Sequence, residues 1–202
     1  MDAERDFLNG KKRAIQKLDQ AINKNKADKT ILPLLIIINE SSYYYTSSSC
    51  AGRIVLLQLP HIGDKQNAQF LGKWHRTIEP AELSSASKNA DVGQLWLLAQ
   101  SPIIHLTAKT TAVADSMLKT AIACGFKNSG IRSLDKKIVV EICSTERLDA
   151  PVGMDGVLFC DDKYLELLVS IANEVLEKSR EKLSRFEEKI KKCLSTHKTT
   201  KQ

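Results

Sequence analysis

The sequence contains no hydrophobic segment long enough to cross a membrane. Its longest apolar run extends from Ile31 to Ile38 and includes Pro33, whereas a membrane-spanning helix needs about 20 apolar residues. The first six residues, Met1 to Asp6, are rich in charge and lack the apolar core of a signal peptide. We therefore expect a cytoplasmic protein that does not associate with membranes.

The cysteines form no pattern typical of a metal or disulfide site. The chain has five of them, an odd number, with no Cys-x-x-Cys pair and no Cys/His cluster. A zinc site or a disulfide framework would require such pairs. We expect no bound metal, and we expect most of these thiols to be small buried hydrophobes: Cys50, Cys124, Cys143, Cys160 and Cys193.

The glycine motifs of several large enzyme classes are also missing. No Gly-x-Gly-x-x-Gly follows a predicted strand, and no phosphate-binding Walker loop is present. The doubly wound dinucleotide fold and the common methyltransferase fold are therefore not indicated. No Gly-x-Ser-x-Gly elbow is present either. A hydrolase built on Ser49 and His75 stays open as an alternative, although the sequence identifies no acidic partner for it.

What the sequence does have is an excess of positive charge. Thirty Lys and Arg residues oppose 24 Asp and Glu, which gives a net charge of +6. This excess favours an anionic partner, nucleic acid first of all, although it could also reflect a basic tail on an ordinary domain. With 202 residues, of which 43% are hydrophobic, the chain suits a single domain over residues 1–202. We expect residues 193–202 to form a disordered basic tail.

Hydrophobic periodicity and turn residues divide the chain into helices and strands. Predicted helices cover residues 2–24, 31–39, 80–89, 110–124 and 163–194, and for residues 31–39 a buried extended segment stays open as an alternative. Predicted strands cover residues 52–59, 70–77, 94–100, 103–108, 127–134, 138–142, 148–152 and 157–160. This order predicts an α+β or mixed α/β fold. We expect one central mixed sheet with flanking helices and a long C-terminal helix.

The segment from Tyr43 to Ile54 is unusually dense in polar side chains. Three tyrosines, a run of serines, a glycine and an arginine follow one another. Two interpretations are open, an edge strand rich in tyrosine and serine or the wall of a binding pocket. In a pocket, Gly52 would let a ligand approach the backbone and Arg53 would bind a carboxylate or phosphate.

Two similar bends suggest that the chain consists of two related halves. Ser49 to Ile54 opens one predicted strand pair, and Asn128 to Arg132 opens another. Such halves would bring both bends to a single cleft. The predicted hairpin places His75 across from the first bend, where a neutral imidazole could accept a proton. The structural alternative for His75, and for His105, is a partly buried ring bonded to a carbonyl.

The chain resembles the family of tRNA wybutosine-synthesising methyltransferases that carry out the third step of the pathway. The likeness extends from about Phe7 to Phe186. The segments that carry it are Tyr44 to Ile54, Trp74-His75, Ser101 to Leu106, Ala123 to Ile131 and Ser144 to Pro151. The sequence departs from the family at Ala51, where a serine is usual, and at Cys143, where we expect an arginine.

The resemblance implies an activity and its partners. Family members use S-adenosylmethionine to methylate N4 of a tricyclic guanosine derivative at position 37 of tRNA(Phe), in the anticodon loop. Their fold is unlike the common methyltransferase fold. The alternative is a non-catalytic tRNA-binding module that retains the pocket.

The resemblance also assigns roles to individual residues. His75 is expected to accept the proton or to orient a group. Asn128 and Ser129 suit the polar edge of the base, and Tyr44 or Tyr45 suits stacking on the tricycle. The expected cofactor-binding residues are Ser47, Ser49, Gly52 and Arg53.

Overall fold

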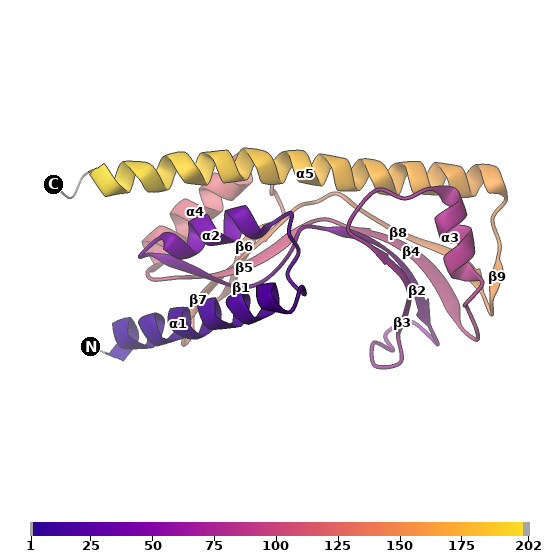
Figure 1. The fold of residues 1–202 in the computed structure, drawn as a ribbon, viewed down its shortest axis with the longest axis horizontal. Coiled ribbons are helices and arrows are strands. Elements are labelled where there is room, and N and C mark those ends of the chain that lie inside the picture. The colour runs from indigo at the N-terminus through magenta and orange to yellow at the C-terminus, as the bar shows by residue number, and fades with distance from the viewer. Residues whose placement is uncertain (1, 200–202) are drawn as a thin grey trace. The chain divides into compact units, whose positions relative to one another are not determined.

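The computed structural model describes residues 2–199, in which groups of strands are separated by helices (Figure 1). The helices are α1 Asp2–Asn23, α2 Leu32–Glu40, α3 Pro80–Ser87, α4 Thr111–Ala123 and α5 Asp162–Thr199. The strands are β1 Tyr44–Cys50, β2 Arg53–Leu59, β3 Gln69–Trp74, β4 Gln94–Gln100, β5 Ile103–Ala108, β6 Gly130–Ser133, β7 Ile138–Cys143, β8 Arg147–Met154 and β9 Val157–Leu158. Every segment predicted as a helix or strand contains the corresponding element.

The described chain divides into two compact units, each built from separated segments. Unit 1 comprises residues 1–51, 102–145 and 181–202, and unit 2 comprises residues 52–101 and 146–180. The chain therefore passes from one unit to the other four times, so the units are not two successive halves. That these units act as one domain stays a prediction.

Each unit contains its own antiparallel sheet. The sheet of unit 1 has the strand order β1-β5-β7-β6, and that of unit 2 has the order β3-β2-β4-β8-β9. All strand pairs in both sheets are antiparallel. The predicted α+β class is confirmed, whereas the single mixed sheet is wrong. Hydrophobic patterning identifies strands but does not specify which strands pair.

The sheet of unit 1 is covered by helices on both faces. Tyr44 and Tyr45, which are successive residues of β1, point to opposite faces. Tyr44 belongs to a core that includes side chains of α2, α4 and the C-terminal part of α5. Tyr45 packs against Phe7 of α1 instead, with ring centroids 5.2 Å apart. β1 is an edge strand of this sheet, which confirms the edge-strand interpretation of the serine-rich segment.

The helices of unit 2 both pack on one face of its sheet (Figure 1). Ile54 and Leu56 of β2 contribute to that core, and so do Leu83 of α3 and Leu168 from the N-terminal part of α5. The alternate residues of β2, beginning with Arg53, point to the other face. No helix of the described part of unit 2 contributes to that second face.

Local signals explain where the helices begin and end. Thr110 caps α4, because its hydroxyl accepts the Val113 N–H at 3.3 Å. Gly125 follows α4 with a φ of +101°, a conformation that glycine adopts without strain. The segment 193–202, predicted to be a disordered tail, is helical as far as Thr199. Residues 200–202 lie outside the described residues.

Two further expectations can be compared with the fold. Only Cys124 is buried, and the other four cysteines are half-buried, so the prediction that most are buried is wrong. Within residues 2–199, no helix combines the length and the apolar character that a membrane crossing requires.

Candidate active site

In unit 1, the serine-rich strand β1 presents hydroxyl groups beside β5. The pairing of these strands shifts register between Thr46 and Ser48, and such a bulge re-aims the side chains that follow it. Asn39 holds the bulge, since its side chain accepts the Thr46 N–H at 2.8 Å and donates to the Thr46 hydroxyl at 2.9 Å. Ser47 is exposed, and its hydroxyl donates to the His105 carbonyl at 3.3 Å. Ser49 is half-buried. These hydroxyls are therefore accessible to a ligand.

Asp28 organises the end of this strand, although the sequence analysis assigned it no role. One carboxylate oxygen accepts the Ala51 N–H at 3.1 Å, and the other accepts the Thr30 N–H at 3.1 Å. The second contact forms a common local turn, in which an aspartate side chain accepts the N–H of the residue two positions later. The first contact spans 23 residues, so no local pattern reveals it.

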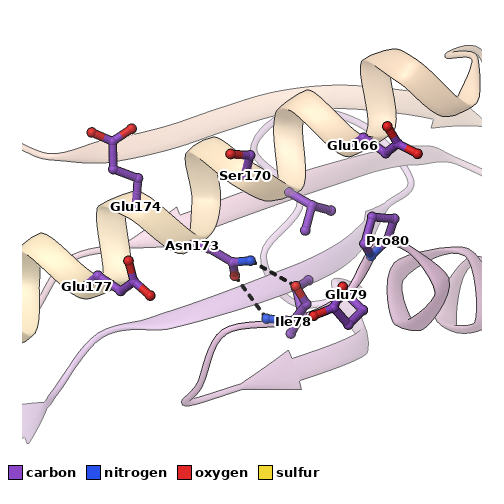
Figure 2. A pocket seen from close by; sticks show the side chains of 9 residues that line it. Ile78, Glu79, Pro80, Glu166, Ser170, Asn173, Glu174 and Glu177 are labelled. Carbon is purple, nitrogen blue, oxygen red and sulfur yellow. Dashed lines mark hydrogen bonds between the residues drawn. The ribbon is translucent and has the colours of Figure 1, made fainter.

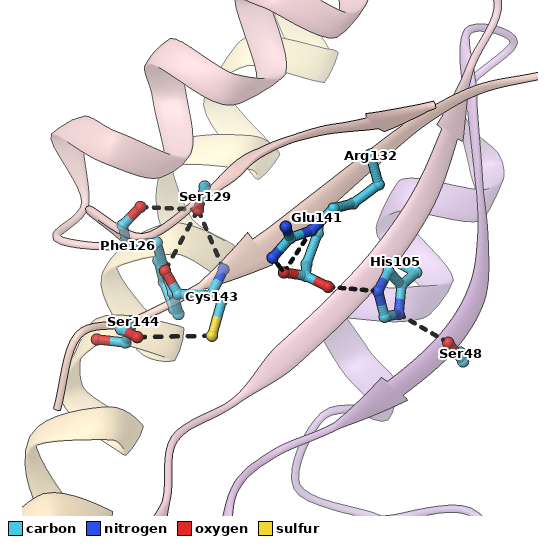
Figure 3. A network of polar contacts seen from close by, with 8 residues as sticks. All are labelled: Ser48, His105, Phe126, Ser129, Arg132, Glu141, Cys143 and Ser144. Atoms are coloured by element: carbon cyan, nitrogen blue, oxygen red, sulfur yellow. Dashed lines mark hydrogen bonds and ion pairs between the residues drawn. The ribbon is translucent and has the colours of Figure 1, made fainter. Parts of the chain in front are cut away.

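The predicted bend at Asn128 and Ser129 lies at the same end of this sheet. The Ser129 hydroxyl donates to the Phe126 carbonyl at 2.7 Å and accepts the Cys143 N–H at 3.1 Å (Figure 3). The Asn128 backbone N–H donates to the Cys143 carbonyl at 3.1 Å, while its side chain is exposed. Ser129 thus joins the bend to β7, and the Asn128 amide is the group of this pair that remains open to a ligand.

Strand register places this bend at a defined distance from the serine-rich strand. Cys50 of β1 pairs with Ile103 of β5, and Ile103 pairs with Cys143 of β7. The bend at Asn128 adjoins Cys143 on the far side. Three strand spacings of about 4.8 Å separate the outer strands of this sheet, roughly 14 Å in all. A single small group cannot contact both ends, whereas an extended cofactor together with a tricyclic base spans a distance of this order.

A chain of polar side chains runs across the same sheet from β1 to β6 (Figure 3). The Ser48 hydroxyl lies 2.9 Å from His105 Nδ1, and His105 Nε2 lies 2.7 Å from the Glu141 carboxylate. Arg132 donates Nε to the other oxygen of Glu141 at 2.8 Å. The Arg132 guanidinium, followed by the His105 bond, holds the pKa of Glu141 below its usual value despite burial. The sequence analysis left His105 open and did not single out Glu141.

The two tyrosines considered for base stacking are both buried. Tyr44 is 6% exposed, and its hydroxyl donates to the Val113 carbonyl at 2.8 Å. Burial raises the pKa of Tyr44 to about 12. Tyr45 is 3% exposed and its ring faces Phe7 of α1. The stacking role predicted for Tyr45 is therefore not supported, because α1 occupies the face that a base would need.

In unit 2, the bend at Gly52 is joined to His75. Gly52 has a φ of +94°, which is the left-handed region that favours glycine. His75 Nδ1 lies 3.1 Å from the Gly52 carbonyl oxygen, and Arg180 donates to the His75 carbonyl at 2.9 Å. A carbonyl only accepts hydrogen bonds, so Nδ1 carries the hydrogen of this bond. The bond fixes the orientation of the imidazole ring beside the bend.

Arg53 lies beside this bend, at the start of β2. Its Nε donates to the Gln100 side-chain oxygen at 2.7 Å, and its guanidinium lies 5.5 Å from the centre of the Phe70 ring. The side chain is half-buried. Among the described residues, the two Nη groups have no hydrogen-bond partner. A guanidinium that is fixed in position and has two available donor groups is suited to bind a carboxylate or a phosphate.

A separate hollow of about 430 Å³ lies between α3 and α5 in unit 2 (Figure 2). Asn173 crosses its floor and bonds both the N–H and the carbonyl of Ile78, each at 2.9 Å. Four glutamates line it: Glu79, Glu166, Glu174 and Glu177. This hollow contains none of the predicted site residues, and its carboxylates would repel an anionic substrate.

The predicted site residues thus fall on both units. Unit 1 carries Tyr45, Ser47, Ser49, Asn128 and Ser129, and unit 2 carries Gly52, Arg53 and His75. Unit 1 brings the end of β1 and the bend at Asn128 to one end of its sheet, and unit 2 joins Gly52 directly to His75. That all of them share one cleft stays a prediction.

Comparison with known proteins identifies the family. The family model described as methyltransferase TYW3 matches residues 9–192. The chain belongs to this family. The likeness stated from its sequence motifs is therefore confirmed.

Relatives of known name extend over nearly the whole chain. The TYW3 relative in Pyrococcus horikoshii is named tRNA(Phe) 7-((3-amino-3-carboxypropyl)-4-demethylwyosine(37)-N(4))-methyltransferase 1 and is 46% identical over 185 residues, covering 91% of this chain and 94% of its own. The similarly named Thermococcus sibiricus protein is 46% identical over 190 residues, covering 94% and 96%.

Solved structures show the same fold. The PH1069 protein of Pyrococcus horikoshii has a TM-score of 0.90 at 45% identity, covering 94% of this chain and 98% of its own. A hypothetical protein from Aeropyrum pernix has a TM-score of 0.71 at 30% identity, covering 82% and 98%. Both proteins thus share the α+β fold of this chain.

Proposed function

We propose that this protein is an S-adenosylmethionine-dependent methyltransferase that acts on tRNA(Phe). Its substrate is the 4-demethylwyosine-type base at position 37 in the anticodon loop, and the atom methylated is N4. The observation that carries this proposal is the match to relatives of that name at 46% identity over more than nine-tenths of the chain. The basic net charge of +6 suits an RNA substrate.

The reaction requires positioning and the removal of one proton. When bound, S-adenosylmethionine supplies a methyl carbon that N4 attacks while the carbon–sulfur bond breaks and its electrons remain on sulfur. Because the enzyme forms no covalent bond in this scheme, no nucleophilic thiol or hydroxyl is needed. We assign removal of the N4 proton to the imidazole of His75, which is held at the bend by its bond to the Gly52 carbonyl.

The hydroxyls and the arginine fit the polar parts of the cofactor. Arg53 is held by Gln100 and offers its Nη donors to the methionine carboxylate. Ser47 and Ser49 offer hydroxyls for the ribose or the amino acid portion. Gly52 has no side chain, so its backbone can be approached closely.

The bend in unit 1 fits the substrate. Asn128 has an exposed side-chain amide, which donates and accepts and therefore suits the polar edge of the tricyclic base. Ser129 acts as a positioning residue here, since its hydroxyl joins the bend to Phe126 and Cys143.

Methyl transfer can be tested directly. The purified protein is incubated with labelled S-adenosylmethionine and with tRNA(Phe) that lacks only this methyl group. After digestion, the tricyclic nucleoside should carry the label and one additional methyl group. Label in no nucleoside, together with intact tRNA binding, would instead support the non-catalytic binding module.

The role of Arg53 has its own test. We expect Arg53→Ala to weaken S-adenosylmethionine binding by about 2 kcal/mol, because a charge-assisted contact is lost. That loss corresponds to roughly 30-fold in Kd. Arg53→Lys keeps the charge without the planar pair of donors, so its Kd for S-adenosylmethionine should lie between those of the wild type and Arg53→Ala. Calorimetry measures both variants, and an unchanged isotherm for Arg53→Ala removes it from the cofactor site.

A further inference from the structure

An exposed aromatic ring with two cations near it lies on the face of the unit 2 sheet that the helices of unit 2 do not cover. Phe70 of the edge strand β3 is 52% exposed. The Lys73 ammonium lies 5.0 Å from the centre of its ring, and the Arg53 guanidinium lies 5.5 Å from it. Both distances are within the range of a cation–π interaction. A single exposed apolar residue needs no explanation, but an exposed ring with two cations near its centre is a specific arrangement.

A β-bulge creates this arrangement. Leu56 pairs with Gly72 and Leu57 pairs with Phe70, so Leu71 is an extra residue in β3. In a regular strand, Phe70 and Lys73 would point to opposite faces because side chains alternate. The extra residue puts both on the same face as Leu57, and bulges commonly re-aim side chains at functional surfaces.

The rest of this face forms an apolar floor next to the ring. Trp96 of β4 pairs with Leu57 and is half-buried, and Leu98 follows on the same face. The acidic group on the neighbouring part of the face, Asp149, is already paired with Arg147. The face therefore presents aromatic and apolar surface together with positive charge. This composition complements a nucleotide, which has a flat base and a negative phosphate.

We propose that Phe70 and Lys73 form a stacking platform for an unpaired nucleotide of the RNA substrate. The Phe70 ring stacks on the base, and Lys73 contacts the adjacent phosphate. The platform rests on the proposed function, which makes the substrate an RNA with unpaired anticodon-loop bases. It adds a binding surface outside the residues assigned to methyl transfer.

The test measures tRNA affinity without cofactor at several salt concentrations. Phe70→Ala should weaken binding of hypomodified tRNA(Phe) by about 5-fold or more, because stacking of one base on an aromatic ring contributes about 1–3 kcal/mol. Phe70→Trp should restore the affinity. Lys73→Gln should lower the slope of log affinity against log salt by nearly one, as expected for one lost phosphate contact.

Matched controls separate the platform from general surface effects. Phe159 is 73% exposed and Lys163 is exposed, and both lie elsewhere on unit 2. Phe159→Ala and Lys163→Gln should leave the affinity and the salt slope unchanged. An unpaired oligonucleotide should compete with the tRNA more strongly than a duplex of equal charge. Equal losses in Phe70→Ala and Phe159→Ala, or equal competition by the duplex, would overturn the platform.

The platform and the proposed reaction fail in different ways. If the wild-type protein transfers methyl groups and Phe70→Ala keeps wild-type tRNA affinity and KM, the platform is wrong and the reaction stands. If the wild-type protein transfers none but its RNA affinity depends on Phe70 and Lys73, the reaction is wrong and the platform stands. The salt slope of Lys73→Gln gives a second readout that does not depend on how Phe70→Ala folds.

Discussion

At the scale of the residue, the bond between His75 and Gly52 makes a prediction about the proton acceptor. We expect His75→Ala to lower the turnover number by about 100-fold or more while S-adenosylmethionine affinity changes little. His75→Asn retains a donor for the Gly52 carbonyl and should preserve the bend without restoring turnover. Single-turnover methyl transfer and calorimetry provide the two measurements.

Glu141 makes a prediction about stability at the same scale. Its pKa is lowered in the folded protein, first by Arg132 and then, against the effect of burial, by His105. The ionised carboxylate therefore stabilises the fold above its ordinary pKa, and this contribution is lost as the pH falls through the lower folded value. We expect Glu141→Gln to reduce the free energy of unfolding at pH 7 by about 2 kcal/mol.

Denaturant unfolding at several pH values tests the Glu141 prediction. The difference in the free energy of unfolding between wild type and Glu141→Gln should be constant near neutral pH. It should become smaller below about pH 4.5, the ordinary pKa of a glutamate. Glu174→Gln serves as the control, since its pair with Lys178 is exposed on both sides and should contribute at most about 0.5 kcal/mol. If the difference in unfolding free energy between wild type and Glu141→Gln is unchanged at low pH, the carboxylate charge is not what stabilises the sheet.

At the scale of the element, Gly72 controls the packing of strand β3. A Cβ added to Gly72 would lie 1.9 Å from the Trp74 ring, whereas one added to Gly130 of β6 would meet nothing within 4 Å. We expect Gly72→Ala to destabilise the protein by about 2 kcal/mol through overpacking. Gly130→Ala should change stability by less than about 0.5 kcal/mol. Thermal or denaturant unfolding of the two variants compares them, and equal stabilities would mean that the Trp74 ring adjusts freely.

At the scale of the whole molecule, the net charge of +6 predicts how RNA binding responds to salt. Each phosphate neutralised by a Lys or Arg releases counterions, so affinity falls steeply with salt concentration. We expect tRNA affinity to fall at least about tenfold between about 50 and about 200 mM salt. Binding of S-adenosylmethionine should change far less over the same range. Fluorescence anisotropy at fixed pH measures the tRNA affinity. A tRNA affinity that does not change with salt would argue against phosphate contacts.

The sequence by itself determined the elements and the family. Helical periodicity, the Thr110 cap and the glycine after α4 are local signals, since they act between residues within about one turn of each other. The motifs around Ser49 and Asn128 were sufficient to identify the family, because their order and spacing can be seen directly in the sequence.

Only the tertiary structure decided which of those residues are accessible and what they contact. Tyr45 reads as a stacking residue in the sequence, yet α1 covers it. The Asp28 contact with Ala51, the His105–Glu141 pair and the bulge that turns Phe70 beside Lys73 all depend on long-range contacts or strand register. Pairing and register follow from the packing of segments far apart in the chain, and a pattern within one segment carries no information about its partner.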